Sequence, residues 1–207
     1  MSEGSSVRLS VPTAEAMHEL GHDLARLSHA GDLIILTGEL GAGKTQLAQG
    51  IGEGLDVAGS VISPTFVLSR IHRSRSGGPA LVHVDAYRLG SEKEIDDLDL
   101  ETYMPIAVTV VEWGEGLTEH LSENRLEVEI LRAEDVEDDT REVVVTPVGP
   151  RWDDLLPEWE KLVNEDMGRD ARADADASRD QSGLVSSGEA QEGVETRSVK
   201  VTYAEGD

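Results

Sequence analysis

One stretch of the chain has the residues and the spacing of a phosphate-binding loop. It reads G-x-x-x-x-G-K-T and consists of Gly38, Glu39, Leu40, Gly41, Ala42, Gly43, Lys44 and Thr45. Glycines let the backbone turn its N–H groups around an anion, the lysine can reach the β- and γ-phosphates, and the threonine hydroxyl can ligate Mg²⁺. The motif predicts nucleotide binding, but it leaves open which nucleotide binds and which reaction follows.

The segments on either side of this loop give it the context that it needs. Residues 33–37 form a short apolar run, which is typical of a strand buried on both faces. Residues 45–49 are good helix formers, so the loop opens a helix whose N-terminus adds positive potential at the phosphates. Strand, loop and helix in this order make a chance match among the 21 glycines a poor explanation.

Two carboxylates follow apolar runs where a nucleotide site requires them. Asp85 ends the run at 81–84, and Glu112 ends the run at 108–111. In an open α/β sheet the C-terminal ends of the strands face the ligand crevice. Either carboxylate could hold Mg²⁺, directly or through water, while the other would orient the attacking water. The alternative for each is a solvated carboxylate at a strand end.

Ser63, Pro64 and Thr65 lie between the loop helix and the next extended segment. In nucleotide switches, a hydroxyl in this position senses the γ-phosphate and the metal. An ordinary turn at the start of a strand uses the same residue types. Both interpretations remain open from position alone.

Several other side chains near these motifs have two interpretations. His83 shares a strand face with Asp85 and resembles a general base, although a packed or surface histidine is the simpler interpretation. Trp113 follows Glu112 and would stack on a base or ribose, or simply cover the sheet. Three arginines are candidates for arginine fingers or for plain surface charges: Arg70, Arg73 and Arg88.

Hydrophobic periodicity predicts an α/β fold, a P-loop NTPase-like mixed sheet with a parallel centre and antiparallel hairpins, flanked by helices. Thr13 is a cap for a helix with apolar residues at 17, 20, 24 and 27. One hairpin pairs residues 66–73 with 80–87, and a second pairs 126–130 with 143–145. Residues 1–150 therefore form the predicted P-loop domain.

The remainder of the chain is expected to be an appendage. A short docking helix is predicted over residues 151–165. It would carry Trp159 and have Pro157 in its first turn. Residues 166–207 contain almost no large apolar side chains, so we expect an acidic, disordered tail.

Composition limits the partners and the compartment. The net charge of −24 argues against broad contact with nucleic acid or an anionic membrane, whereas a phosphate loop creates its own local anion site. The chain has no cysteine, which excludes disulfides and cysteine-ligated metal centres. It has neither an apolar leader nor a run of about 18 apolar residues, so a cytoplasmic protein is the default expectation.

With these residues in hand, the chain resembles the TsaE family, the small bacterial P-loop ATPases of tRNA threonylcarbamoyladenosine biosynthesis. The phosphate loop is generic, but three further segments in this order and spacing are specific: S-P-T-F at 63–66, H-V-D-A-Y-R-L at 83–89 and V-E-W-G-E at 111–115. The resemblance covers residues 7–147. Gly114 stands where many relatives have proline, a difference that leaves both carboxylates in place.

The resemblance implies an ATPase in which Lys44 contacts the phosphates, and Thr45 and Glu112 form the Mg²⁺ shell. Asp85 would be the water-activating carboxylate, and Thr65 would belong to a switch-like loop. The resemblance also implies that hydrolysis is weak alone and is coupled to the transferase TsaD and its companion TsaB. These proteins install threonylcarbamoyl on adenosine 37 of tRNA, so contact with tRNA would be indirect.

Three other functions of a phosphate loop remain open. A small-molecule kinase needs an acceptor pocket and usually an arginine-rich lid, and the only arginines of that kind are Arg70, Arg73 and Arg75 near a Gly-rich turn. A GTPase is disfavoured because no N-K-x-D stretch occurs. A non-catalytic adaptor would bind the nucleotide only as a structural ligand.

Overall fold

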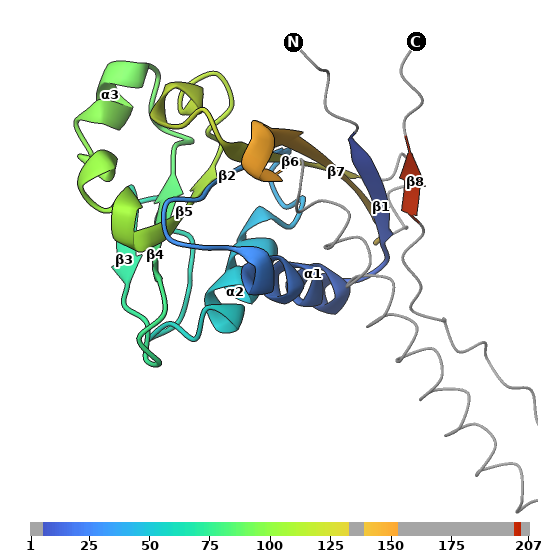
Figure 1. The fold of residues 1–207 in the computed structure, drawn as a ribbon. Helices are drawn as coiled ribbons and strands as arrows, with labels where there is room; N and C mark the ends of the chain where they lie inside the picture. Colours follow the sequence, from blue (N-terminus) through green and yellow to red (C-terminus); the bar gives the residue numbers. More distant parts are fainter. Residues whose placement is uncertain (1–5, 133–138, 153–200, 204–207) are drawn as a thin grey trace, which may run out of the picture.

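The computed structural model describes residues 6–132, 139–152 and 201–203 (Figure 1). The parallel centre of the sheet is formed by the most apolar runs of the sequence. Strand β2 (Leu33–Gly38) is paired in parallel with β5 (Ala107–Glu112) on one side and with β6 (Arg125–Arg132) on the other. Strand β4 (Ala80–Asp85) is parallel to β5 on its far side. The C-terminal ends of β2, β4 and β5 therefore meet at one edge.

Antiparallel strands complete the sheet on both sides. Strand β3 (Ser69–His72) pairs with β4, and β7 (Arg141–Val148) pairs with β6, which confirms both predicted hairpins. Strand β1 (Val7–Val11) pairs with β7, and β8 (Val201–Tyr203) pairs with β1. The order of strands is β3-β4-β5-β2-β6-β7-β1-β8, and the expectation of a mixed sheet is confirmed.

Strand β8 lies within the segment 166–207, for which the sequence predicts disorder, and its residues depart from that prediction. Val201, Thr202 and Tyr203 are all residue types with a high preference for strands, and β1 offers them an open edge. Three strand-forming residues within a long acidic, polar segment are too few to give a recognisable strand pattern in the sequence.

Helices α1 (Ala14–Leu27) and α2 (Lys44–Gly54) lie side by side on one face of the sheet (Figure 1). Thr13 caps α1 as predicted, because its hydroxyl accepts a hydrogen bond from the N–H of Ala16 at 3.1 Å. The two helices approach closely because Gly50 of α2 has no side chain. A Cβ at this position would stand 1.9 Å from the carbonyl oxygen of His18 on α1.

Among the described residues, short elements cover part of the opposite face. Helix α3 (Glu92–Asp96) and the 3₁₀ turns η1 (Leu100–Thr102) and η2 (Met104–Ile106) pack their apolar residues over β4 and β5. A third 3₁₀ turn, η3 (Glu119–Leu121), lies near β2 and β6. The core therefore has two layers, one on each side of the sheet.

The sheet domain extends slightly beyond its predicted end at residue 150. Trp152 is buried in the same core layer as the apolar residues of α1, and the guanidinium of Arg151 pairs with Asp32. Residues 153–200 lie outside the described ranges, so the predicted docking helix over 151–165 stays a prediction beyond Trp152. In the part of the chain that the structure describes, every helix is too short or too polar to cross a membrane.

Candidate active site

The phosphate loop curls at the C-terminal end of β2 through backbone angles that favour glycine. Gly38, Gly41 and Gly43 have φ values of +141°, +78° and +119°. Gly38 also lies close to β6, since a Cβ there would be 2.3 Å from the carbonyl oxygen of Ile130. Gly43 is the N-cap of α2 and offers no side-chain cap, so the first N–H groups of that helix are left for an anion.

Lys44 is buried at the mouth of the loop. Its ammonium donates hydrogen bonds to the carbonyl oxygens of Gly38 at 2.6 Å and Glu39 at 2.8 Å. The same ammonium lies 3.7 Å from the centroid of the Trp113 ring. Burial lowers the pKa of Lys44 from its ordinary value, while the charges of Glu112 and Asp85 act in the opposite direction. The positive charge is thus held beside two carboxylates.

The two residues expected in the Mg²⁺ shell contact each other. The hydroxyl of Thr45 donates to the carboxylate of Glu112, with distances of 3.0 Å to Oε1 and 3.1 Å to Oε2. Glu112 is only 3% exposed. Hydroxyl and carboxylate oxygens are ligands that Mg²⁺ prefers, and this ion usually retains waters and phosphate oxygens besides one or two protein ligands. The pair therefore fits a Mg²⁺ site that a nucleotide would complete.

Asp85 and Glu112 occupy paired positions at the ends of β4 and β5. Asp85 Oδ2 accepts hydrogen bonds from the hydroxyls of Ser63, at 2.8 Å, and of Thr65. Its Oδ1 accepts from the N–H of Tyr87 at 3.1 Å. Residues 62–67, called here the hydroxyl loop, are thereby attached to one of the two candidate catalytic carboxylates.

The hydroxyl loop contains a turn as well as this contact. The N–H groups of Val67 and Leu68 both donate to the carbonyl oxygen of Pro64, at 2.9 and 2.7 Å. The local geometry thus includes the turn of the simpler interpretation, and the hydroxyls of Ser63 and Thr65 point at Asp85. Phe66 follows with 86% of its surface exposed.

Most of the predicted site residues line one pocket, called here the loop pocket. It is lined by the phosphate loop from Leu40 to Gln46 together with six other residues: Ser63, Thr65, Asp85, Tyr87, Glu112 and Trp113. A nucleotide phosphate held by the loop would therefore lie close to both carboxylates. Gly38 and Glu39 do not line the pocket, and they act instead through the carbonyl oxygens that hold Lys44.

Trp113 covers the lysine in the loop pocket. Its φ of +62° is unusual for a residue other than glycine. The ring contacts the Lys44 ammonium and packs against Tyr87 with centroids 5.1 Å apart. This arrangement places the ring over Lys44 in the loop pocket, and its stacking on a base or ribose stays a prediction.

The candidate arginines lie outside the loop pocket. Arg70 and Arg73 are exposed, and neither lines it. Arg88 is also exposed, and its guanidinium lies 4.7 Å from the centroid of the Phe66 ring. These positions fit surface charges, with Arg88 in contact with the hydroxyl loop.

Two partners of the carboxylates were not expected from the sequence. The imidazole Nε2 of His83 lies 2.8 Å from Glu112 Oε1, and the Ser63 hydroxyl reaches Asp85. The alternation of β4 places His83 and Asp85 on one face, but only the register with β5 shows which carboxylate the histidine meets. A local pattern in the sequence does not determine the register between two strands.

A second pocket adjoins the phosphate loop and is not lined by Asp85 or Glu112, and we call it the flanking pocket. Its other lining residues come from the start of α1 and the start of β7, and Thr13 and Arg141 are among the polar ones. It shares four residues with the loop pocket: Gly41, Ala42, Gly43 and Gln46.

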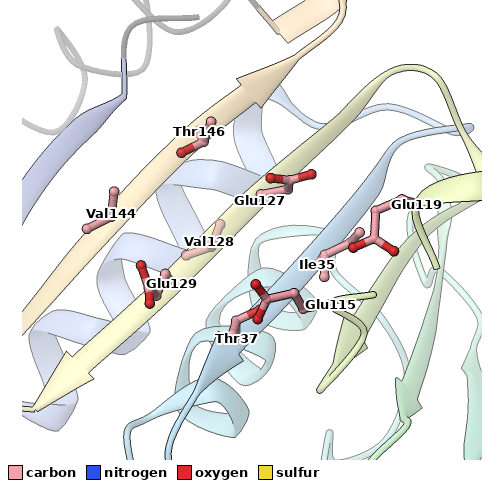
Figure 2. Close-up of a pocket in the computed structure, with 9 residues that line it drawn as sticks. All are labelled: Ile35, Thr37, Glu115, Glu119, Glu127, Val128, Glu129, Val144 and Thr146. Atoms are coloured by element: carbon pink, nitrogen blue, oxygen red, sulfur yellow. The ribbon is translucent and has the colours of Figure 1, made fainter. Parts of the chain in front are cut away.

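A third pocket lies on the opposite face of the sheet, over β2, β6 and β7 (Figure 2). Four glutamates surround it: Glu115, Glu119, Glu127 and Glu129. Glu127 pairs with Arg125, and Glu119 accepts from the N–H groups of Gly116 and Thr118. This pocket shares no residue with the loop pocket.

Comparison with known proteins identifies similar chains. Residues 11–143 match the family model described as threonylcarbamoyl adenosine biosynthesis protein TsaE. A protein of Streptomyces coelicolor named tRNA threonylcarbamoyladenosine biosynthesis protein TsaE is 57% identical over 138 residues, which are 66% of this chain and 93% of that protein. A Bacillus subtilis protein of the same name is 40% identical over 68% of this chain and 85% of its own length.

The fold also has a counterpart among solved structures. The crystal structure of Bacillus subtilis YdiB superposes with a TM-score of 0.62 and 29% sequence identity. The match covers 77% of this chain and 98% of that one. The mixed sheet and its flanking helices are therefore shared with an experimentally determined structure.

Proposed function

This chain belongs to the TsaE family, and we propose that it acts in tRNA threonylcarbamoyladenosine biosynthesis as a Mg²⁺-dependent ATPase. In this proposal, ATP drives a switch that acts on a complex of TsaB and TsaD homologues. The observation that carries it is the contact between Thr45 and Glu112 beside Lys44, within a pocket that also contains Asp85.

The phosphate end of ATP would be held by this chain's own charges and backbone. The N–H groups at the start of α2 and the ammonium of Lys44 would bind the β- and γ-phosphates. Thr45 and Glu112 would hold the Mg²⁺, whose contribution is to neutralise negative charge on the phosphates. Since the lysine is already buried against loop carbonyls, little further ordering is needed on binding.

Asp85 would orient the water that attacks the γ-phosphate. Its Oδ2 accepts hydrogen bonds from both Ser63 and Thr65, so both lone pairs of this oxygen are engaged while those hydroxyls stay in place. Movement of the hydroxyl loop toward the γ-phosphate would free Oδ2 to bind the water and take its proton. This coupling would account for hydrolysis that is weak until a partner repositions the loop.

The flanking pocket supports the placement of the nucleoside. Gly41 and Gly43 line both pockets. A nucleotide whose phosphates occupy the loop would therefore extend its ribose and base into the flanking pocket, toward Thr13 and Arg141. The base would then lie in a pocket that Asp85 does not line. The absence of an N-K-x-D stretch supports ATP over GTP.

A protein partner would read the nucleotide state at the rim of the loop pocket. Five large apolar side chains around the loop and the hydroxyl loop are exposed: Leu40, Ile62, Phe66, Val67 and Tyr87. Apolar residues gathered at a functional site often mark a protein contact. The net charge of −24 is consistent with contact to tRNA only through such partners.

The test is ATP hydrolysis by the purified protein, alone and with the TsaB–TsaD pair from the same organism. We expect weak Mg²⁺-dependent hydrolysis that rises with the pair and is lost in Lys44→Ala. Hydrolysis that ignores the pair, together with phosphate transfer to a small hydroxylated acceptor, would instead indicate a small-molecule kinase. A Lys44→Ala protein that still supports tRNA modification would indicate a non-catalytic adaptor.

A further inference from the structure

We infer that His83 is a positioning residue whose imidazole fixes the carboxylate of Glu112 in the orientation that ligates Mg²⁺. The inference rests on the proposed function, because it concerns the metal site of the proposed ATPase. It assigns a role to a buried histidine that neither the sequence patterns nor the comparisons explain.

The sheet itself fixes the contact. His83 on β4 is paired with Val110 on β5, and Glu112 lies two residues further along the same face. The imidazole is 0% exposed, and its Nε2 is 2.8 Å from Glu112 Oε1. Both residues are held by backbone pairing in the centre of the sheet, so the geometry of this hydrogen bond depends little on loop movement.

The surroundings of His83 identify its donor atom. Nδ1 is buried and has no hydrogen-bond partner among the described residues. A proton on Nδ1 would be left unsatisfied, whereas a proton on Nε2 meets a carboxylate oxygen that can only accept. The imidazole therefore donates from Nε2 to Glu112.

Packing alone does not require a histidine at this position. Three of the neighbouring residues on the same face are buried and apolar: Leu81, Val108 and Val110. An apolar side chain would fill the space without an unpartnered buried nitrogen, which costs about 1–3 kcal/mol. The hydrogen bond to Glu112 offsets that cost, and it explains why a polar ring occupies the core.

The bond determines how the Glu112 carboxylate is presented. Oε1 accepts from both His83 and Thr45, while Oε2 accepts from Thr45 alone. Among the described residues, the carboxylate without the imidazole would keep its hydrogen bonds from the threonine hydroxyl and lose one restraint on its rotation. Hydrogen bonds from outside the metal shell to a ligating carboxylate commonly contribute about 10- to 100-fold to metal affinity or activity.

Direct participation in hydrolysis is a poorer explanation for His83. The side chain has no exposed surface and does not line the loop pocket, so a water bound there is out of its reach. Its effect must therefore pass through Glu112.

The experiment compares the affinity of a fluorescent, non-hydrolysable ATP analogue in Mg²⁺ and in EDTA. His83→Leu removes the donor, and His83→Gln keeps an amide N–H at a similar distance. We expect His83→Leu to lose about tenfold in the Mg²⁺-dependent gain of affinity. The affinity of His83→Leu for the analogue in EDTA should stay within about twofold of the wild-type value. His83→Gln should restore most of the Mg²⁺-dependent gain in affinity.

His72→Leu is the matched control. His72 is also buried, on the adjacent strand β3, but its Nδ1 faces the carbonyl oxygen of Ala58 rather than the site. This variant should keep the full Mg²⁺ gain. If His83→Leu does not fold, His83→Asn replaces it, because its shorter amide does not reach Glu112.

The outcomes separate the inference from the proposed function. A wild-type protein whose nucleotide affinity gains nothing from Mg²⁺ would overturn the proposed function and the role of His83 with it. A wild-type gain that His83→Leu retains would overturn the role of His83 alone. Equal losses in Mg²⁺ and EDTA that glutamine does not rescue would show a purely structural histidine.

Discussion

The loop pocket is bounded by the phosphate loop with α2 on one side and by the hydroxyl loop on the other, and the two sides are held differently. On the first side, Lys44 is 4% exposed, and Leu47 and Ile51 behind it are fully buried. On the second side, Phe66 and Val67 are 86% and 55% exposed. The wall formed by α2 is part of the core, with the exposed Leu40 at its rim, whereas the hydroxyl loop carries largely exposed apolar side chains.

The strength of attachment follows from this difference. The phosphate-loop side is fixed by the packing of α2 against α1 and the sheet, a close fit that tolerates little displacement. The hydroxyl loop is fixed to Asp85 by side-chain hydrogen bonds, each worth about 1.5–3 kcal/mol net because the acceptor is a charged carboxylate. In the proposed mechanism, the first side binds the phosphates and the second senses them.

The largest effect should come from a substitution that disrupts the packing of α2 against α1. Gly50→Ala would place a Cβ 1.9 Å from the His18 carbonyl oxygen, which forces α1 and α2 apart. We expect the free energy of unfolding to fall by about 3 kcal/mol, even though alanine favours a helix by about 1 kcal/mol over glycine. Urea denaturation followed by circular dichroism measures this change.

Gly78→Ala is the control for that substitution. Its Cβ would lie 3.5 Å from the Ser74 hydroxyl, an ordinary contact in an exposed turn. We expect a change within about 0.5 kcal/mol. Similar losses in both variants would contradict the close packing of the two helices as the cause.

The next largest effect should come from removing the metal carboxylate. Glu112→Ala deletes the acceptor of Thr45, and we expect it to lower Mg²⁺-dependent ATP hydrolysis by about 100-fold or more. Much of the nucleotide affinity measured without metal should remain, because the loop and Lys44 are untouched. Unchanged turnover in a steady-state phosphate-release assay would remove Glu112 from the metal shell.

A smaller effect is expected on the exposed side. Phe66→Ala should change the free energy of unfolding by less than about 0.5 kcal/mol, because the ring is largely exposed. Stimulation of hydrolysis by the TsaB–TsaD pair should nevertheless fall by about tenfold if the ring is a contact residue. Ile106→Ala, another exposed apolar residue but on η2, should leave the stimulation intact.

The smallest expected effect concerns pH and the edge strand β3. Burial lowers the pKa of His72 below its ordinary value of 6.5. The unfolded chain therefore binds a proton first as the pH falls below 6.5, and the folded state loses stability until its own lower pKa is reached. Urea denaturation midpoints measured across this acidic range should fall as the pH is lowered in the wild type. They should fall less steeply in His72→Leu, and the difference between the two proteins gives the contribution of His72, because both share the other titrating groups.

The residues that the sequence placed correctly are those whose partners are dictated by a general rule of the fold. Asp85 and Glu112 meet because both end parallel strands, and C-terminal strand ends share an edge. Thr45 follows from the phosphate-loop motif. The strands β2, β3, β4, β5, β6 and β7 follow from apolar runs and turns.

The contacts that the sequence did not predict depend on long-range pairing. His83 meets Glu112 only because β4 lies next to β5 in this register, and Ser63 reaches Asp85 only through the path of a surface turn. The insertion of β2 between β5 and β6 is also a property of the whole sheet. Hydrophobic periodicity describes each segment alone and carries no information on these neighbours.

The division into a binding side and a sensing side is tested most directly by ATP affinity and hydrolysis, with and without the TsaB–TsaD pair, in Lys44→Ala and Thr65→Val. We expect Lys44→Ala to lose roughly 10- to 100-fold in ATP affinity, because a charged hydrogen-bond donor is removed from the phosphates. Thr65→Val should bind ATP within about threefold of the wild type, yet show no stimulation by the pair. Equal losses of ATP affinity in the two variants would contradict this division.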